Sequence, residues 1–210
     1  MTDDPKALVA AGYDAIAENY LERYGRSKVR DYWLGELIAR LPRHARVLDL
    51  GCGAGLPVAR ELAARGFAVV GADGSRRQIE MAQRNVAGAE FIQADITTAE
   101  LSPAAFDAVA AFYSITHIPR EEHPALLQSI ADWLKPGGWF IASMGAEQLR
   151  DRCEEWLGVP MYFSHYAAEE NAALVHAAGF TVERAEVVAQ DNEDASFLWI
   201  IARRPEKGTP

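Results

Sequence analysis

Three alternate glycines follow a short apolar run in the stretch VLDLGCGAGLPVARELAARG, residues 47–66. Gly51, Gly53 and Gly55 lack Cβ atoms, so they permit a tight turn and let a ligand approach the backbone closely. The dinucleotide fingerprint G-x-G-x-x-G would place its last glycine at position 56, where this chain has Leu56. The turn therefore favours a nucleotide-bearing ligand other than a dinucleotide. A plain strand-to-helix turn is the alternative for the glycines alone.

Two carboxylates follow the glycine turn, each at the end of an apolar segment. Asp73 ends FAVVGAD, roughly 20 residues past the glycines, where a carboxylate can accept hydrogen bonds from ribose hydroxyls. Asp95 ends AEFIQAD and could meet a further polar group, such as the amino group of an adenine. Either acid alone could be a surface-loop residue. Together with the glycine turn, the two acids predict a nucleoside site.

Five histidines are candidates for a general base, because imidazole titrates near neutral pH. His117, in SITHIP, follows an apolar segment on the side of the molecule expected to hold the site; packing or capping a helix is the alternative. His165 lies in the aromatic segment MYFSHY. His44 is expected on the surface at the opposite end, and His123 and His176 at the surface or rim.

The elements that must position these residues alternate in type along the chain. Apolar spacing near 3.6 predicts helices over 6–23 and 27–41. Beyond them, strand and helix patterns alternate, which is typical of a parallel sheet with helices on both faces. Strands are expected at 45–50, 67–73, 89–95, 106–114, 139–144, 180–189 and 196–204. Helices are expected at 56–65, from Ser75 with Gln78 completing its cap, from Pro119 to the KPGG at 135–138, at 146–158 and at 167–178.

Composition and charge exclude several classes of protein. The 210 residues can bury a core, and 50% hydrophobic with 24% charged residues is typical of a globular chain. A net charge of −9 without a dense basic run disfavours nucleic acid as a partner. Cys52 and Cys153 form no disulfide framework, and neither a signal peptide nor a membrane span is evident. We expect a cytoplasmic protein of one domain, with a helical N-terminal cap (1–42), an α/β core (43–204) and a flexible tail (205–210).

Five motifs in order resemble those of class I S-adenosylmethionine-dependent methyltransferases: VLDLGCGAG, VVGADGS, FIQADI, FDAVAAFYSITHI and LKPGGWFIAS. The resemblance extends from about Tyr13 to Arg204. It implies a Rossmann-like, doubly wound α/β fold whose seven-stranded sheet has an antiparallel last strand. It also implies S-adenosylmethionine as cofactor and S-adenosylhomocysteine as product; no side-chain spacing demands a metal. The cofactor residues it implies are Gly51, Cys52 and Gly53 for the methionine part, Asp73, Gly74 and Ser75 for the ribose, Gln78, Asp95 and Ile96 for the adenine, and Phe112 and Tyr113 for the sulfonium.

The N-terminal YDAIAENY also resembles a family feature, a Tyr-rich helix that caps the cofactor. Tyr13 and Tyr20 are seven residues apart, so they share one helix face. A phenolic oxygen or ring face near a sulfonium is favourable, as for other cations over aromatic rings. Both tyrosines could instead be core aromatics. Tyr13 and His117 are the candidate catalytic residues.

Methyl transfer is an in-line displacement that needs alignment, exclusion of water and, for a hydroxyl or protonated amine acceptor, a base. The acidic charge and short chain favour a small-molecule acceptor, with O- or N-methylation predicted. Two alternatives stay open: a nicotinamide-dependent oxidoreductase, against which Leu56 and Asp95 argue, and a non-catalytic scaffold that binds the cofactor. Candidate acceptor contacts, any of which could instead be core residues, are Tyr24, Trp33, Trp156, Tyr162 and His165.

Overall fold

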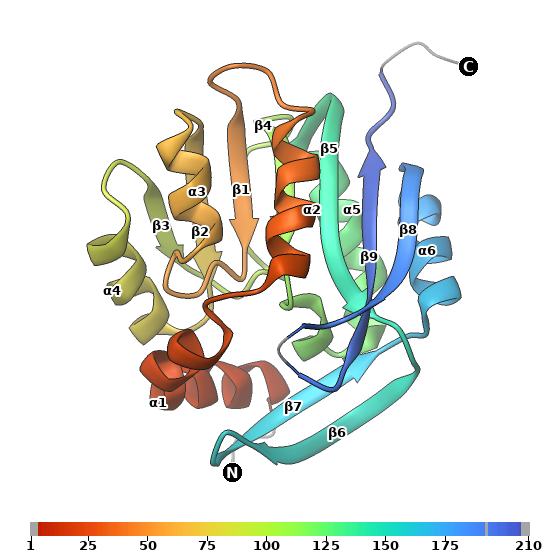
Figure 1. Cartoon of the computed structure of the whole chain (residues 1–210). Coiled ribbons are helices and arrows are strands. Elements are labelled where there is room, and N and C mark those ends of the chain that lie inside the picture. The colour runs from red at the N-terminus through yellow and green to blue at the C-terminus, as the bar shows by residue number, and fades with distance from the viewer. Residues whose placement is uncertain (1–3, 192, 207–210) are drawn as a thin grey trace.

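The computed structural model describes residues 4–191 and 193–206 and is built on a seven-stranded sheet with helices on both faces (Figure 1). The strands of this sheet are β1 (Arg46–Leu50), β2 (Ala68–Asp73), β3 (Glu90–Gln93), β4 (Phe106–Ala111), β5 (Leu134–Gly145), β8 (Thr181–Ala189) and β9 (Ser196–Arg203). Their order is β3-β2-β1-β4-β5-β9-β8. The pairs from β3 to β5 are parallel, whereas β9 runs antiparallel to both β5 and β8. The predicted α/β fold with an antiparallel last strand is therefore confirmed.

The two faces of the sheet bury separate sets of apolar side chains, because successive strand residues point to opposite faces. On one face, Val47 packs with Leu62 and other residues of α2 (Lys28–Ile38) and α3 (Val58–Ala64). On the other face, Leu48 packs with Leu127 and other residues of α5 (His123–Trp133), and α6 (Ala168–Ala177) covers the same face. The strands are thus covered on both sides, which explains their nearly continuous apolar sequences.

Helix α1 (Pro5–Tyr24) lies across the carboxyl ends of the strands instead of on a sheet face (Figure 1). It begins at Asp4, whose side chain accepts a hydrogen bond from the backbone N–H of Lys6, and Pro5 occupies the first turn, where no backbone donor is needed. The helix contacts α4 (Arg76–Asn85) and the strand β7 (Val159–His165). Because it covers the edge where parallel strands end, α1 closes the region in which such sheets bind ligands.

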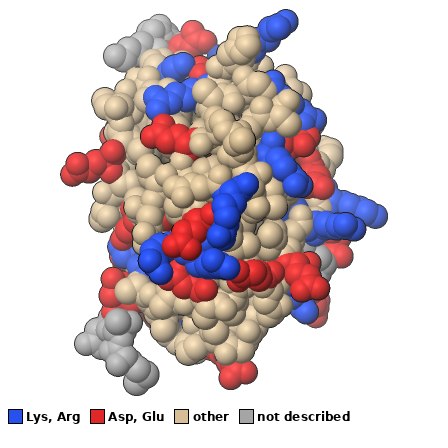
Figure 2. All heavy atoms as spheres, turned by 90° about the vertical axis from the view of Figure 1, so that its left-hand side faces the viewer, with Lys and Arg blue, Asp and Glu red and all other residues tan. Residues whose placement is uncertain are grey.

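The face that carries α4 shows basic and acidic side chains interspersed (Figure 2). Arg76 and Arg77 pair with Glu80 within α4, and Arg77 also pairs with Glu18 of α1. The pair between Arg77 and Glu18 joins α1 to α4 at the surface. Within the described ranges, no helix has both the length and the apolar character that crossing a bilayer demands.

The helix predicted at 146–158 is wrong, because these residues belong to an antiparallel hairpin. Strands β6 (Leu149–Trp156) and β7 (Val159–His165) form a separate two-stranded sheet beside α1 (Figure 1). Leu157 and Gly158 connect them with φ values of +52° and +84°. Positive φ at both central residues gives the turn whose twist matches a two-stranded ribbon. The polar stretch before the turn pairs with the aromatic stretch after it, and this pairing overrides the local helical pattern.

Other element boundaries differ by smaller amounts. The helix expected from Pro119 begins as a short 3-10 turn, Arg120–Glu122, and becomes α-helical at His123. Strand β5 starts directly after α5, at Leu134, earlier than the predicted 139. Of the predicted tail, residues 205 and 206 lie outside helix and strand, and 207–210 fall outside the described residues.

Candidate active site

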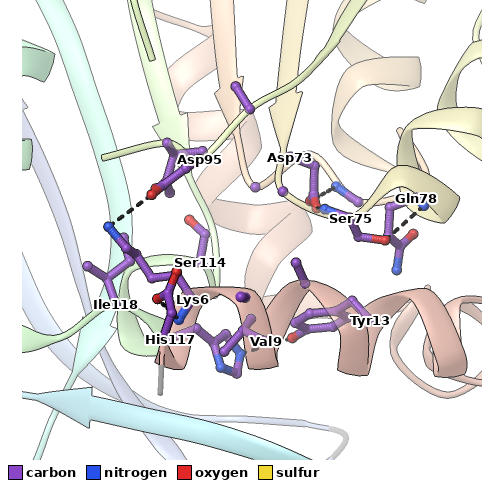
Figure 3. A pocket seen from close by; sticks show the side chains of 18 of the residues that line it. Lys6, Val9, Tyr13, Asp73, Ser75, Gln78, Asp95, Ser114, His117 and Ile118 are labelled. Carbon is purple, nitrogen blue, oxygen red and sulfur yellow. Dashed lines mark hydrogen bonds and ion pairs between the residues drawn. The ribbon is translucent and has the colours of Figure 1, made fainter. Parts of the chain in front are cut away.

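A cavity of about 270 Å³ lies between α1 and the carboxyl ends of β1 to β4. Figure 3 shows Asp73, Ser75 and Gln78 facing Tyr13 of α1 across this space, with Asp95 above Lys6. We call it the nucleoside cavity. The residues predicted to bind the cofactor that line it are Tyr13, Tyr20, Gly51, Gly53, Asp73, Gly74, Ser75, Gln78, Asp95 and Ile96; the predicted base His117 also lines it.

The glycine turn needs glycine at its first position for two independent reasons. Gly51 has a φ of +73°, a conformation that side chains rarely adopt. A Cβ atom on Gly51 would also lie 2.3 Å from the Cβ of Ser114. Ser114 itself is fixed by a 2.9 Å hydrogen bond from its hydroxyl to the carbonyl of Leu50. The backbone of β1 and the residues after β4 thus approach each other at the cavity without an intervening side chain.

Asp73 both fixes the turn and faces the cavity. Its carboxylate accepts hydrogen bonds of 2.9 Å from the backbone N–H groups of Gly53 and Ser75. Burial raises the pKa of Asp73, and these two N–H donors offset part of that rise. A carboxylate has about four acceptor positions. Asp73 can therefore accept further hydrogen bonds from hydroxyl groups of a ligand.

Gln78 presents a buried amide with no bonding partner among the described residues. Its residue is 1% exposed, and neither Oε1 nor Nε2 makes a hydrogen bond there. Buried polar groups are normally hydrogen-bonded, so this amide fits a polar ligand in the cavity. The predicted N-cap is confirmed, since the Ser75 hydroxyl accepts from the Gln78 backbone N–H at 3.1 Å. The Gln78 side chain, however, does not complete the predicted capping box.

Asp95 lines the cavity but is already engaged by charge. Its carboxylate lies 2.9 Å from the ammonium of Lys6 and accepts two hydrogen bonds from Thr97. Burial alone would raise the pKa of Asp95, but the bonds from Lys6 and Thr97 outweigh burial and lower it. Lys6 also lies 2.8 Å from Glu122. Lys6, which belongs to no motif and was not predicted, thereby connects α1 to the loop after β3 and to the 3-10 turn Arg120–Glu122.

The two predicted catalytic residues are in contact. The Tyr13 hydroxyl lies 2.9 Å from Nε2 of His117, and Nδ1 of His117 lies 2.9 Å from the carbonyl of Tyr162. A carbonyl can only accept, so Nδ1 carries the proton and Nε2 accepts the hydrogen bond that Tyr13 donates. Burial lowers the pKa of His117 to about 4 and raises the pKa of Tyr13 well above its usual value. The pair is therefore neutral near pH 7.

A second cavity, of about 220 Å³, adjoins the first; we call it the aromatic cavity. Tyr20 lines both cavities. The Trp156 ring lies 6.0 Å from that of Tyr13 and 6.5 Å from that of His117, which places this cavity beside the Tyr13–His117 pair. The lining residues are Tyr20, Tyr24, Tyr113, Glu154, Trp156, Phe163, Glu193, Ala195 and Phe197.

A small third cavity extends from the glycine turn toward α2 and contains two charged residues that were not predicted. Arg30 and Asp49 line it together with the predicted residues Cys52, Phe112 and Tyr113. Asp49 is 2% exposed, and its Oδ2 has no hydrogen-bond partner among the described residues. Burial, and next the charge of Asp73, raise the pKa of Asp49 to about 7. A lone aspartate in an apolar strand was the signal that sequence reasoning overlooked.

Three predicted acceptor contacts lie outside these cavities. Trp33 is buried in the core and stacks on Trp199 with ring centroids 5.8 Å apart. The Tyr162 hydroxyl donates to Asp151 at 2.6 Å. His165 packs over Gly145, with Nδ1 2.6 Å from the carbonyl of Glu147. Core packing already occupies the Trp33 side chain. Hydrogen bonds to the hairpin and to the residue Glu147 before it already occupy Tyr162 and His165.

Two of the other histidines match their predicted positions. His44 and His176 are exposed, as expected. His123, predicted at the surface or rim, is instead buried at the start of α5, with 1% of the residue exposed. Its Nε2 lies 3.1 Å from the carbonyl of Ile118. Across the described residues, no three His, Cys, Asp or Glu side chains gather in a way that could hold a metal ion.

The family model for a methyltransferase domain matches residues 21–185. The chain belongs to the methyltransferase-domain family. Its fold is that of the class I S-adenosylmethionine-dependent methyltransferases. This finding does not support the oxidoreductase alternative.

Curated relatives of this methyltransferase cover different shares of its length. It is 29% identical to 27-O-demethylrifamycin SV methyltransferase of Amycolatopsis mediterranei, over 90% of this chain and 79% of that protein. It is 36% identical to a ubiquinone biosynthesis O-methyltransferase of Paracidovorax citrulli, but over only 47% of this chain and 42% of the relative. The methyltransferase thus spans most of the first relative and less than half of the second.

A solved structure supports the assignment of the fold. The 1,6-didemethyltoxoflavin-N1-methyltransferase of Burkholderia thailandensis, with its substrate and S-adenosylhomocysteine bound, has a TM-score of 0.78 to this methyltransferase. The likeness covers 98% of this chain and 92% of that one. At 20% identity it bears on the fold alone.

Proposed function

We propose that this methyltransferase transfers the methyl group of S-adenosylmethionine to an oxygen or nitrogen atom of a small molecule held in the aromatic cavity. The observation that carries the proposal is the shared wall between the two larger cavities, formed by Tyr20. Donor and acceptor would meet beside Tyr20, where the two cavities adjoin. One relative supports a small-molecule acceptor, since it is named for a rifamycin derivative.

The described residues fit the parts of this cofactor. When bound, it supplies a methyl group already activated by a positively charged sulfur. Asp73 would accept hydrogen bonds from the ribose hydroxyls, and the unpaired amide of Gln78 would bond to a polar group of the nucleoside. The unpartnered Asp49 oxygen and the guanidinium of Arg30 suit the ammonium and carboxylate of the amino-acid end.

Tyr13 and His117 would remove the proton of the acceptor. An acceptor hydroxyl or ammonium would donate to the Tyr13 oxygen, and the Tyr13 proton would pass to Nε2 of His117 over the existing 2.9 Å contact. Nδ1 would keep its bond to the Tyr162 carbonyl, which stabilises the imidazolium. General-base assistance contributes roughly 10²–10⁴-fold to turnover when the pKa of the base lies near the working pH, so the lowered pKa of His117 places its contribution at the low end of this range.

Calorimetry with S-adenosylhomocysteine and NADH, followed by a transfer assay over hydroxyl and amine acceptors, tests the proposal. We expect binding of S-adenosylhomocysteine, no binding of NADH, and transfer to a subset of acceptors. Tyr13→Phe and His117→Asn should lower kcat by a larger factor than they raise the Kd of S-adenosylhomocysteine, although both residues line the nucleoside cavity. Binding without transfer to any acceptor would favour the non-catalytic scaffold, and NADH binding alone would overturn the proposal.

A further inference from the structure

The aromatic cavity has walls of rings that meet at different angles. Tyr24 and Trp156 stack at 5.6 Å with an interplanar angle of 17°. Phe163 meets Trp156 edge-on at 6.2 Å. Tyr113 meets Phe197 edge-on at 5.1 Å on another side. The cavity therefore offers ring faces and edges from several elements to a single guest.

The charged residues that line this cavity are both acidic. Glu193, in the connection between β8 and β9, is partly buried and lines the cavity beside Tyr24. Burial raises the pKa of Glu193 by more than the neighbouring Tyr24 hydroxyl lowers it. Glu154, the other carboxylate, pairs at 2.6 Å with Arg152, whose side chain is largely exposed. Of the two carboxylates, Glu154 already has a paired cation, whereas Glu193 forms no ion pair among the described residues and is reached only by the more distant charge of Arg23.

The rim already holds one cation over an aromatic face. The guanidinium of Arg23, an exposed residue, lies 5.5 Å from the centroid of the Tyr24 ring. Cations over aromatic faces and beside carboxylates are stabilised electrostatically, and more strongly where water is excluded. An anionic guest would be repelled by Glu193, which lacks the ion pair that compensates Glu154.

We infer that the aromatic cavity selects an acceptor that carries a cationic amino group on an apolar or ring-bearing frame. The amino group would lie beside Glu193, and the frame would pack among Tyr24, Trp156 and Phe163. The inference rests on the proposed function for the role of the cavity as the acceptor site. It adds the charge and shape of the acceptor, which the proposed function leaves open.

Three probes of nearly equal shape test the inference. Phenethylamine is a cation at neutral pH, phenethyl alcohol is neutral and hydrocinnamate is an anion. Their Kd values are measured by calorimetry on the full chain, with and without saturating S-adenosylhomocysteine. We expect the amine to bind about tenfold or more tightly than the alcohol, and hydrocinnamate to bind weakest. The inference is overturned if the amine and the alcohol have equal Kd values, or if the anion binds more tightly than either. This comparison uses the wild-type chain alone.

Glu193→Gln localises the effect. It should remove most of the preference for the amine over the alcohol. Glu155→Gln changes net charge equally at an exposed hairpin residue outside the cavity lining, so it should keep the preference. Equal effects of the two variants would contradict the inference. The binding of S-adenosylhomocysteine to the wild-type chain, measured without probes, separately tests the proposed function.

Discussion

Asp73 combines two tasks in one carboxylate, since it holds the turn through Gly53 and Ser75 and still has acceptor capacity for a ligand. Asp73→Ala should weaken the binding of S-adenosylhomocysteine by about 1–3 kcal/mol, because buried hydroxyls would lose their acceptor. Calorimetry measures the change in Kd. Asp107→Asn is the control, since Asp107 pairs with Lys135 at the opposite end of the strands. An unchanged Kd in Asp73→Ala would contradict the ribose assignment.

His117 should make folding stability depend on pH in a definite window. Burial lowers its pKa to about 4 in the folded chain, against about 6.5 when unfolded. Between these values the unfolded chain binds the extra proton, so the free energy of unfolding falls as pH decreases from 6.5 to 4. The loss approaches about 3 kcal/mol. The free energy of unfolding, measured by urea titration at several pH values, should fall more steeply with decreasing pH in the wild type than in His117→Asn. The same dependence on pH in both proteins would refute the buried neutral state of His117.

The sequence allowed most residues within motifs to be predicted, but not isolated charged residues, nor Asp49 within VLDLGCGAG. Gly51 and Asp73 were predicted because they occur at the ends of recognisable strands. Lys6, Arg30 and Asp49 lie far apart in sequence or inside apolar segments, so nothing local signals that their charges reach the same cavities. Their positions depend on how α1 and α2 pack, which only the tertiary structure defines.

Among the elements, the central sheet was predictable and the hairpin was not. Buried parallel strands such as β1 and β4 have nearly continuous apolar sequences, which identify them as strands. The hairpin has only one face against the molecule, where Met161 is buried near Gly12 of α1. Its first strand is mostly polar, so its conformation depends on pairing with β7 and on positive φ at Leu157 and Gly158.

Helix α1 should detach more readily from the cavity when its N-terminal ion pairs are removed. Lys6 lies 2.9 Å from Asp95 and 2.8 Å from Glu122, with all three side chains partly exposed. Lys6→Met should therefore raise the dissociation rate of S-adenosylhomocysteine modestly, by about two- to fivefold. Stopped-flow displacement measures that rate. Lys135→Met, which removes an ion pair with Asp107 far from the cavity, should leave it unchanged.

The whole molecule carries a net charge of −9, which should raise the association rate of a cationic ligand. S-adenosylmethionine has one more positive charge than S-adenosylhomocysteine, so the two form a matched pair. The association rate of S-adenosylmethionine should fall several-fold between about 0.02 and 0.5 M salt, because screening weakens long-range attraction. The rate for S-adenosylhomocysteine should change much less. Equal salt dependence of the two rates would show that the overall charge has no part in capture.

Tyr20 is a wall of all three cavities, and it belongs to the helix that covers them. Any movement of α1 that admits the donor also dismantles one side of the acceptor cavity. An acceptor bound before the donor would therefore be released when α1 moves to admit the donor. Turnover would then follow a compulsory order, in which the donor binds first and its demethylated product leaves last. In steady-state kinetics, that product would compete with the donor but not with the acceptor.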